Sequence, residues 1–338
     1  MKSFRVFDAT GSRRGGFVSA LPAGTSHWLS SGLGKAMSDD WGEPPRASTQ
    51  VKEVAGEVKM REATNKAVGV VALLAVAVLM PTGASAETTR CRKVTSIPTT
   101  ISSPGIYCLK KDLVTNISTG NAIEIAANNV TVDLNGYKLG GLAAGTATSA
   151  NGIVGYNRQN ISIRNGTIRG FGYGVKLGGG GGHLVEDLRL DHNRVEGIRI
   201  DELDSTVVRN NRVIHTESDV HTHTYGIYVS QVDGCTVIDN DVVQTMGTEN
   251  GYGISARYAD NSTFERNRIS QTSGDGLSYG LFLWASFHSL LVDNRILGLL
   301  DVGLYCNSDS ELRDNLVSPG VTTAYSIGSS CVDSGNNH

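Results

Sequence analysis

Three consecutive stretches decide the fold: YGIYVSQVDGCTVIDN (225–240), YGISARYADNSTFERN (252–267) and YGLFLWASFHSLLVDN (279–294). Each begins with Tyr-Gly, continues with apolar residues at every second position, and ends in an asparagine. Looser copies, in which Gly or Ala precedes an apolar, any and apolar residue, start at 152, 174, 197, 303 and 324. Two short stretches with a period of two in each repeat, without helical periodicity, indicate a β-solenoid.

Stacking of the repeats predicts the interior. In a pleated strand one residue in two points inward, where it lies on its equivalent in the next coil. The first predicted apolar column contains Val175, Ile198, Ile227, Ile254, Leu281 and Leu304, and the second contains Leu177, Ile200, Val229, Ala256, Leu283 and Cys306. The asparagines predict a structural ladder at one turn, because each amide can bond the next coil. Its predicted members are Asn210, Asn240, Asn267, Asn294 and Asn315.

The repeat resembles the right-handed parallel β-helix of the pectin-lyase-like superfamily over about residues 95–336. The openings IPTTISSPGIYCLKKDL (97–113) and NNVTVDLNGYKL (128–139) also look like the first coils of many secreted bacterial members. The resemblance implies an all-β, single-stranded solenoid of about nine coils. We expect an N-terminal cap and first coil over 87–130 and the repeats over 131–338. In similar enzymes the polysaccharide lies on one sheet beside long loops.

A secretory signal peptide is predicted at residues 60–86. Met60 is followed by basic residues, an apolar run (67–80) and the sequence Ala-Ser-Ala, which is the order of such signals. We therefore expect translation to start at Met60, residues 1–59 to be a non-native or disordered extension, and the mature protein to be secreted, without a stable membrane span, from about Glu87. A membrane-anchored protein with a cytoplasmic tail is the alternative.

Charge argues against nucleic acid as a partner. Residues 87–338 contain 20 Lys and Arg against 26 Asp and Glu, a net charge of −6, so the exported part has no basic field. All five cysteines also lie there, where oxidation is possible. We predict a disulfide between Cys91 and Cys108, which flank a short segment at the start of the domain, and a small buried residue at Cys235. We expect a monomer.

Insertions occur at one corner of three consecutive coils. The distance from Gly to the next Asn stays at 12 to 14 residues, whereas the distance from Asn to the next Gly lengthens in three neighbouring repeats. The extra residues predict adjacent loops at 212–225, 242–252 and 269–279, which would form a ridge beside a flat sheet and so a groove. Neutral loop growth is the alternative.

Outward positions on the strands beside this ridge predict a polysaccharide site. Aromatic side chains offer faces for sugar rings, and Lys176, Arg199 and Arg257 suit the carboxylates of a uronic-acid polymer. An oligomer interface, packing under the loops, or pairing of the cations with Asp201 or Glu196 are alternatives. The predicted substrate-binding residues are Lys176, Asp201, Phe282, Trp284, Tyr305 and Asn307.

The densest titratable cluster lies in the first predicted loop, where Asp219, His221, His223 and Tyr225 are in phase in an extended segment. Such a set can hold a metal ion or transfer protons. The sequence requires no cofactor, and Ca²⁺ is a candidate ligand. For proton removal at C5 of a uronate, Arg199 or Arg257 would neutralise the carboxylate, His221 or His223 would be the base, and Tyr225 or Tyr228 the acid.

Two alternatives to this lyase or epimerase remain. Tyr-Gly recurs at 173, 225, 252 and 279, so Tyr225 could belong to a structural stack and the histidines to a solvated loop. A non-catalytic carbohydrate-binding or surface-adhesion module would then explain the groove. A glycoside hydrolase would need two facing carboxylates, for which Asp201, Asp219 and Asp275 are available, although the motifs of polygalacturonases and pectate lyases are absent.

Overall fold

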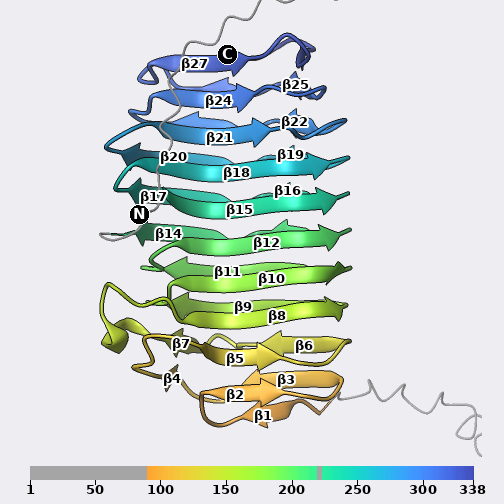
Figure 1. Cartoon of the computed structure of the whole chain (residues 1–338), viewed down its shortest axis with the longest axis vertical. Coiled ribbons are helices and arrows are strands. Elements are labelled where there is room, and N and C mark those ends of the chain that lie inside the picture. The colour runs from red at the N-terminus through yellow and green to blue at the C-terminus, as the bar shows by residue number, and fades with distance from the viewer. Residues whose placement is uncertain (1–89, 219–222) are drawn as a thin grey trace, which may run out of the picture. The chain divides into compact units, whose positions relative to one another are not determined.

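A computed structural model describes residues 90–218 and 223–338, which all belong to one compact unit. The predictions for residues 1–59, for the signal peptide at 60–86, and for Asp219 and His221 lie outside the described residues. The chain winds into a parallel β-helix, in which coils stack along one axis (Figure 1). A 3-10 turn, η1 (Leu142–Ala144), is the one helical element of this part of the chain, and no described helix is long and apolar enough to cross a membrane.

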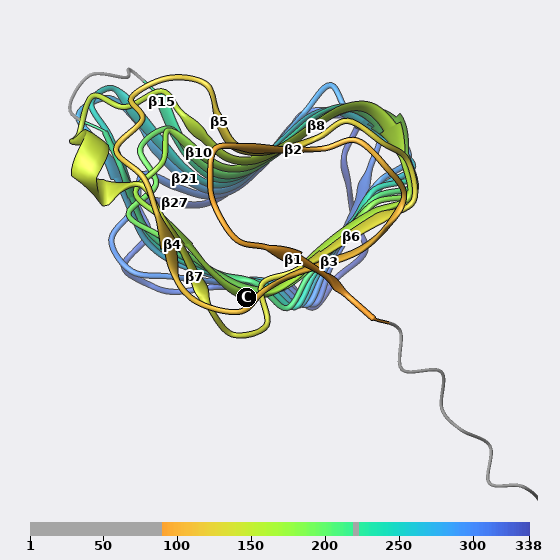
Figure 2. The same cartoon turned by 90° about the horizontal axis from the view of Figure 1, so that it is seen from below.

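Ten parallel strands form the sheet that faces the viewer in Figure 1, here called the groove sheet. Seen end-on, this sheet curves inward between two lobes (Figure 2). Its strands are β2 (Thr99–Ile101), β5 (Asn121–Ile125), β8 (Asn151–Gln159), β10 (Tyr173–Gly181), β12 (Glu196–Asp204), β15 (His223–Asp233), β18 (Asn250–Asp260), β21 (Ser278–Trp284), β24 (Val302–Cys306) and β27 (Thr323–Ile327).

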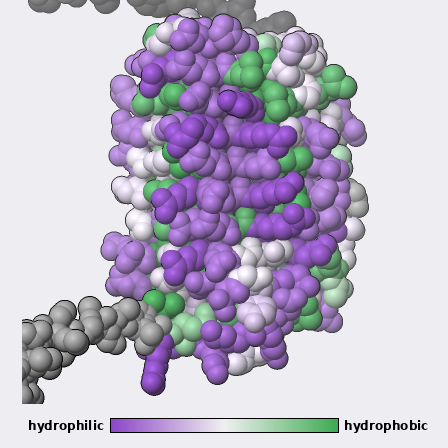
Figure 3. All heavy atoms as spheres, turned by 180° about the vertical axis from the view of Figure 1, so that it is seen from behind, coloured by the Kyte–Doolittle hydropathy of each residue, from purple (hydrophilic) through white to green (hydrophobic). Residues whose placement is uncertain are grey.

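Eighteen strands form the rest of the wall, here called the back sheet. They are β1 (Arg92–Val94), β3 (Gly105–Leu109), β4 (Leu113–Val114), β6 (Val130–Asp133), β7 (Lys138–Gly140), β9 (Ile161–Arg169), β11 (Leu184–Asp191), β13 (Val207–Arg209), β14 (Arg212–Glu217), β16 (Thr236–Ile238), β17 (Asp241–Gly247), β19 (Thr263–Glu265), β20 (Arg268–Gly274), β22 (Leu290–Val292), β23 (Arg295–Leu297), β25 (Glu311–Arg313), β26 (Leu316–Val317) and β28 (Val332–Asp333). Hydrophilic side chains dominate this face (Figure 3), and ion pairs such as Arg209–Glu186 and Arg268–Asp241 join neighbouring coils across it.

The strand register confirms both predicted apolar columns. Ile198, for example, pairs with Val175 on one side and with Ile227 on the other, and all three are fully buried. The same alignment continues through β18, β21 and β24 in both columns. Side chains that stack directly on their equivalents fill the interior without helices, because each coil covers the apolar face of the next.

An asparagine ladder is present at the turn inside the back sheet, but one predicted member was wrong. The buried Asn211, not Asn210, accepts from Leu188 N–H and bonds Asn240 in the next coil. Asn210 is exposed and has a left-handed backbone (φ 53°), as do Asp239 and Asp293 one coil and three coils further on. At each turn the first residue bends the chain and the second carries the buried amide. The ladder therefore contains Asn211, Asn240, Asn267, Asn294, Asn315 and Asn337.

The three predicted loops are mostly strand, so this expectation was wrong. Residues 212–217, 241–247 and 268–274 form β14, β17 and β20, which pair with one another through Thr216, Thr245 and Thr272. Three neighbouring insertions of similar length can satisfy their backbone groups by extending the ladder, which is more favourable than leaving them as separate loops. The ridge consequently consists of lengthened strands.

Candidate functional site

The outer face of the groove sheet carries two rows of aligned side chains. Register places Lys176, Arg199 and Tyr228 in one row, which continues to Ser255, Phe282 and Tyr305. The second row contains Gly178, Asp201, Ser230, Arg257 and Trp284. The long side chains in both rows are partly exposed, so they can contact a ligand lying on the sheet.

A column of tyrosines borders these rows at the ends of the strands nearest the ridge. Tyr225 and Tyr252 stack with ring centroids 4.8 Å apart and an interplanar angle of 12°, and Tyr279 continues the stack at 5.1 Å. In register, Glu196 occupies the position between Tyr173 and Tyr225. In the tyrosine column, the carboxyl group of Glu196 therefore stands where the neighbouring coils have an aromatic ring.

Glu196 is held by Arg199, which also binds Asp201. The guanidinium donates to Glu196 Oε1 and to Asp201 Oδ2, each at 2.9 Å. Glu196 is only 2% exposed, and its Oε2 has no hydrogen-bond partner among the described residues. Burial raises the pKa of Glu196 to about 7, although the charge of Arg199 and its hydrogen bond act in the opposite direction. This carboxyl group can therefore exchange a proton near neutral pH.

The second cation of this region, Lys176, lies over aromatic rings and forms no ion pair with a carboxylate of the described residues. Its Nζ is 4.5 Å from the ring centroid of Tyr173 and 5.8 Å from that of Tyr156. Arg199 lies in the same way over Tyr228, at 4.8 Å. Cation–π contacts of this kind fix the position of a charge while leaving its hydrogen-bond donors available.

Arg257 and the aromatic residues follow two to three coils further along. The guanidinium carbon of Arg257 is 5.4 Å from the ring centroid of Phe282, which stacks on Tyr305 at 4.7 Å and 11°. Trp284 lies edge-on to Tyr258, which is about half exposed. The groove sheet thus presents flat rings and cations together over at least six coils.

Of the residues predicted to transfer protons, His223, Tyr225 and Tyr228 lie in the described structure. His223 begins β15, its ring is edge-on to Tyr252 at 6.2 Å, and its buried Nδ1 has no partner in the described part of the chain. Tyr225 is 8% exposed, and burial raises its pKa. Asn307 accepts a hydrogen bond from the backbone N–H of Ala285, so its carbonyl oxygen has a structural partner.

The cysteines form two disulfides in the described structure. One joins Cys91 to Cys108, and the other joins Cys306 to Cys331. Cys235 is a buried free thiol, and burial raises its pKa to about 12. Both disulfides lie near the ends of the stack, where a coil has a neighbour on only one side.

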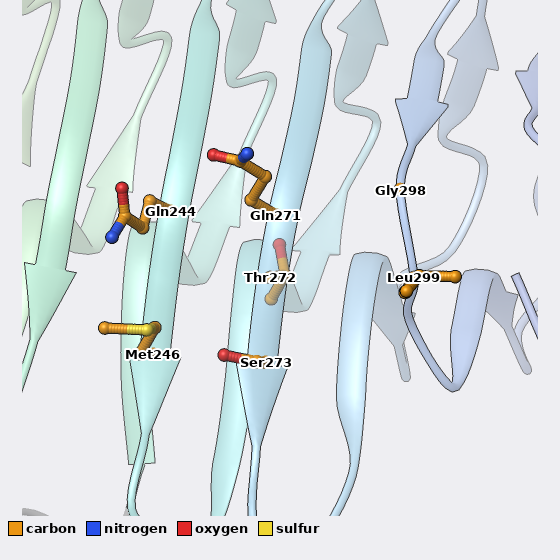
Figure 4. A pocket seen from close by; sticks show the side chains of 7 residues that line it. All are labelled: Gln244, Met246, Gln271, Thr272, Ser273, Gly298 and Leu299. Carbon is orange, nitrogen blue, oxygen red and sulfur yellow. The ribbon is translucent and has the colours of Figure 1, made fainter. Parts of the chain in front are cut away.

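A separate hollow of about 490 Å³ lies on the back sheet. It is lined by Gln244, Met246, Gln271, Thr272, Ser273, Gly298 and Leu299. The side chains of Gln244 and Gln271 extend in the same direction, away from Gly298 (Figure 4). The hollow is lined by residues of the ridge strands β17 and β20 and of the segment after β23, and by none of the predicted catalytic or substrate-binding residues.

Fold and register define the chain as a right-handed parallel β-helix protein. Residues 114–279 match the family model described as periplasmic copper-binding protein (NosD). No curated protein sequence matches the chain.

Solved structures share the fold at low sequence identity. The enzymatically active domain of bacteriophage CBA120 tailspike protein 2 is 14% identical with a TM-score of 0.55, over 72% of this chain and 42% of that one. Full-length tailspike protein 2 from an Escherichia coli O157:H7 bacteriophage is 14% identical with a TM-score of 0.53, over 72% of this chain and 38% of that one. The A-module of an Azotobacter vinelandii mannuronan C-5 epimerase is 12% identical with a TM-score of 0.48, over 70% of this chain and 79% of that one. The chain therefore spans about two fifths of the tailspike chains that it matches.

Proposed function

We propose that the protein binds an acidic polysaccharide outside the cytoplasm, along the outer face of the groove sheet. The observation that carries this proposal is the alignment of cations and partly exposed aromatic rings in two neighbouring rows of one inward-curving sheet. A polymer of sugar rings can stack on the rings and place its carboxylates against the cations. The tailspike neighbour is described as an enzymatically active domain, so a chain with this fold can carry an enzymatic activity.

Charge favours an acidic polymer over a neutral one. No ion pair of Lys176 or Arg257 with a carboxylate occurs within residues 90–218 and 223–338, so both charges are available to a ligand. Arg199 is shared by Glu196 and Asp201. When Glu196 is protonated, Arg199 is balanced by one carboxylate instead of two, and a uronate carboxylate can take the free place.

Catalysis is the second candidate, and the unusual pKa of Glu196 favours it. A uronate carboxylate bound to Arg199 would acidify the proton at C5. A base would take this proton. It would be either Glu196 in its ionised form, after Arg199 has moved to the ligand, or His223, as the sequence predicts. Elimination would then form a C4–C5 double bond, break the C4–oxygen bond and protonate the leaving oxygen. Tyr228, which pairs in register with Arg199, would be the acid. Return of a proton to the other face of C5 would instead give epimerisation.

One experiment separates these functions. The full chain is incubated with alginate, pectate, hyaluronan and a neutral glucan, with and without Ca²⁺, while binding is measured by affinity electrophoresis and elimination by ultraviolet absorbance of unsaturated uronate ends. Retarded migration in at least one acidic polymer, and none in the glucan, is the expected result. Absorbance that is lost in Glu196→Gln would support catalysis. Equal retardation by the neutral glucan, or none by any polymer, would overturn the proposal.

A further inference from the structure

Two histidines and an aspartate meet on the back sheet, away from the groove. Asp191 is the last residue of β11 and pairs with Ile214 of β14, so the residues that follow them, His192 and His215, lie side by side on adjacent coils. Their imidazole rings have centroids 4.6 Å apart. None of these three residues has a role in the proposed polysaccharide site.

Both imidazoles lie within hydrogen-bonding distance of the same carboxylate oxygen. Nδ1 of His192 is 2.6 Å and Nδ1 of His215 is 3.2 Å from Asp191 Oδ1. One donor atom from each of the three residues lies within 4.8 Å of the other two. In a tetrahedral site with metal–donor distances near 2.0 to 2.1 Å, two donors are about 3.3 Å apart. The 3.2 Å separation between His215 Nδ1 and Asp191 Oδ1 is close to this spacing, whereas the 2.6 Å separation between His192 Nδ1 and the same oxygen would have to widen for an ion to enter.

The two histidines occupy aligned left-handed backbone positions, and their imidazoles are partly exposed. His192 and His215 have left-handed conformations, with φ of 53° and 51°, and so do Gly170 before them and Gln244 after them in the stack. Left-handed positions favour glycine and asparagine, yet two consecutive coils place histidine there. The conformation interrupts the in-and-out alternation of the strand and turns neighbouring side chains to the same side of the wall.

We propose that Asp191, His192 and His215 bind a divalent late first-row transition metal ion such as Zn²⁺ or Cu²⁺. Imidazole nitrogens with a carboxylate oxygen suit such ions, whereas Ca²⁺ and Mg²⁺ prefer oxygen donors alone. The side chain of Asp191 is 8% exposed and those of the histidines are 35% and 37% exposed. The carboxylate is therefore fixed in the wall, and solvent reaches the open side of the site.

Arginines orient the carboxylate. Asp191 Oδ2 lies 3.5 Å from Arg189 and 3.8 Å from Arg169, which leaves Oδ1 directed at the imidazoles. Contacts of this kind to the second oxygen of a ligand keep the first in place. The same positive charges oppose a cation, so the affinity should depend strongly on having both imidazoles.

The hollow of Figure 4 begins one coil beyond this site. Gln244 follows His215 in the column of left-handed residues and also lines the hollow. Three protein donors leave at least one coordination position of a four-coordinate ion for water or a ligand. A small ligand bound to that position would extend over Gln244 and the hollow.

The test titrates the full chain with Zn²⁺ by calorimetry and with Cu²⁺ by electron paramagnetic resonance. We expect one site per chain and a copper spectrum with splitting from two nitrogens. His192→Asn and His215→Asn retain a side chain that tolerates the left-handed backbone. Each should weaken binding by more than the roughly 10- to 100-fold that follows the loss of an outer hydrogen-bond partner.

Two controls identify the site. His288→Asn removes another left-handed histidine near a carboxylate, Asp309, and should leave the affinity unchanged. The double variant His221→Asn/His223→Asn removes the remaining clustered pair in the sequence and should also leave it unchanged. Absence of stoichiometric binding would overturn the proposal, and so would binding that survives in His192→Asn and His215→Asn but is lost in either control.

Discussion

Glu196 pairs in register with Tyr225, so a carboxyl group stands next to a phenol ring in a column of tyrosines. Burial raises the pKa of both groups, and the charge of Glu196 raises that of Tyr225 further. A carboxyl group enclosed by rings prefers its neutral form, because the rings cannot replace the water that solvates a negative charge. The protonation state of Glu196 therefore changes the net charge of the groove.

Replacement of this carboxyl group should change how stability depends on pH. The pKa of Glu196 is about 7 in the folded protein, against an ordinary value of 4.5. The folded state binds this proton more tightly than the unfolded state does, so protonation of Glu196 stabilises the fold. This stabilisation is fully present below about pH 4.5 and is lost as pH rises through 7. It amounts to about 3 kcal/mol. Urea unfolding of Glu196→Gln should therefore show a smaller deficit, or a gain, relative to the parent at pH 8 than at pH 4.5.

The control for this prediction is Glu124→Gln, which changes an exposed carboxylate on the same sheet. Its free energy of unfolding relative to the parent should stay nearly constant across this pH range. A Glu196→Gln difference that is equally flat would mean that the carboxyl group titrates at its ordinary pKa.

Asn211→Ala should destabilise the β-helix. Its side chain accepts from Leu188 N–H at 3.1 Å and donates to Val185 carbonyl at 2.9 Å, and all of these groups are buried. Loss of the amide leaves both backbone groups without partners, which costs about 3 kcal/mol. Urea denaturation followed by far-ultraviolet circular dichroism would measure the shift.

Asn210→Gly is the matched control, because Asn210 is exposed and left-handed and glycine adopts that backbone freely. Its effect should stay within about 0.5 kcal/mol. If Asn210→Gly were the more damaging change, the ladder would run through the residue that the sequence first suggested.

The sequence predicted the solenoid and its columns because a period of two, repeated at steps of one coil, leaves few other ways to bury the apolar residues. It misplaced Asn210 because adjacent asparagines at 210 and 211 do not show which one bends the chain. Aligning the following repeats, where Asp239 precedes Asn240 and Asp293 precedes Asn294, would have selected Asn211.

Site prediction was weaker for a different reason. Register, not local sequence, places Glu196 in the tyrosine column, and the signal was the one Tyr-Gly pair replaced by Glu-Gly at 196–197. The lengthened strands were read as loops, although the aligned threonines at 216, 245 and 272 indicated continued pairing. The histidine and aspartate cluster joins residues 24 positions apart, which only the coil length brings together.

Phe282→Ala should weaken polysaccharide binding more than it weakens the fold. Phe282 stacks on Tyr305 and lies partly exposed in the same row as Arg199. Loss of a stacking ring costs about 1 kcal/mol, or roughly fivefold to tenfold in affinity. Phe287→Ala removes an exposed aromatic ring outside the two rows, and affinity electrophoresis should show no change for it. Equal losses in both variants would place the ligand elsewhere.

Cys235 should resist alkylation in the folded protein and react once the protein unfolds. The thiol is 1% exposed, and burial raises its pKa to about 12, so almost no thiolate forms at pH 8. The other four cysteines form Cys91–Cys108 and Cys306–Cys331, and the whole sequence has five. Iodoacetamide followed by mass spectrometry should therefore find no label on native protein and one label after denaturation without reductant. Three labels would show that one disulfide does not form, and a label on native protein would show that the coil around Cys235 opens readily.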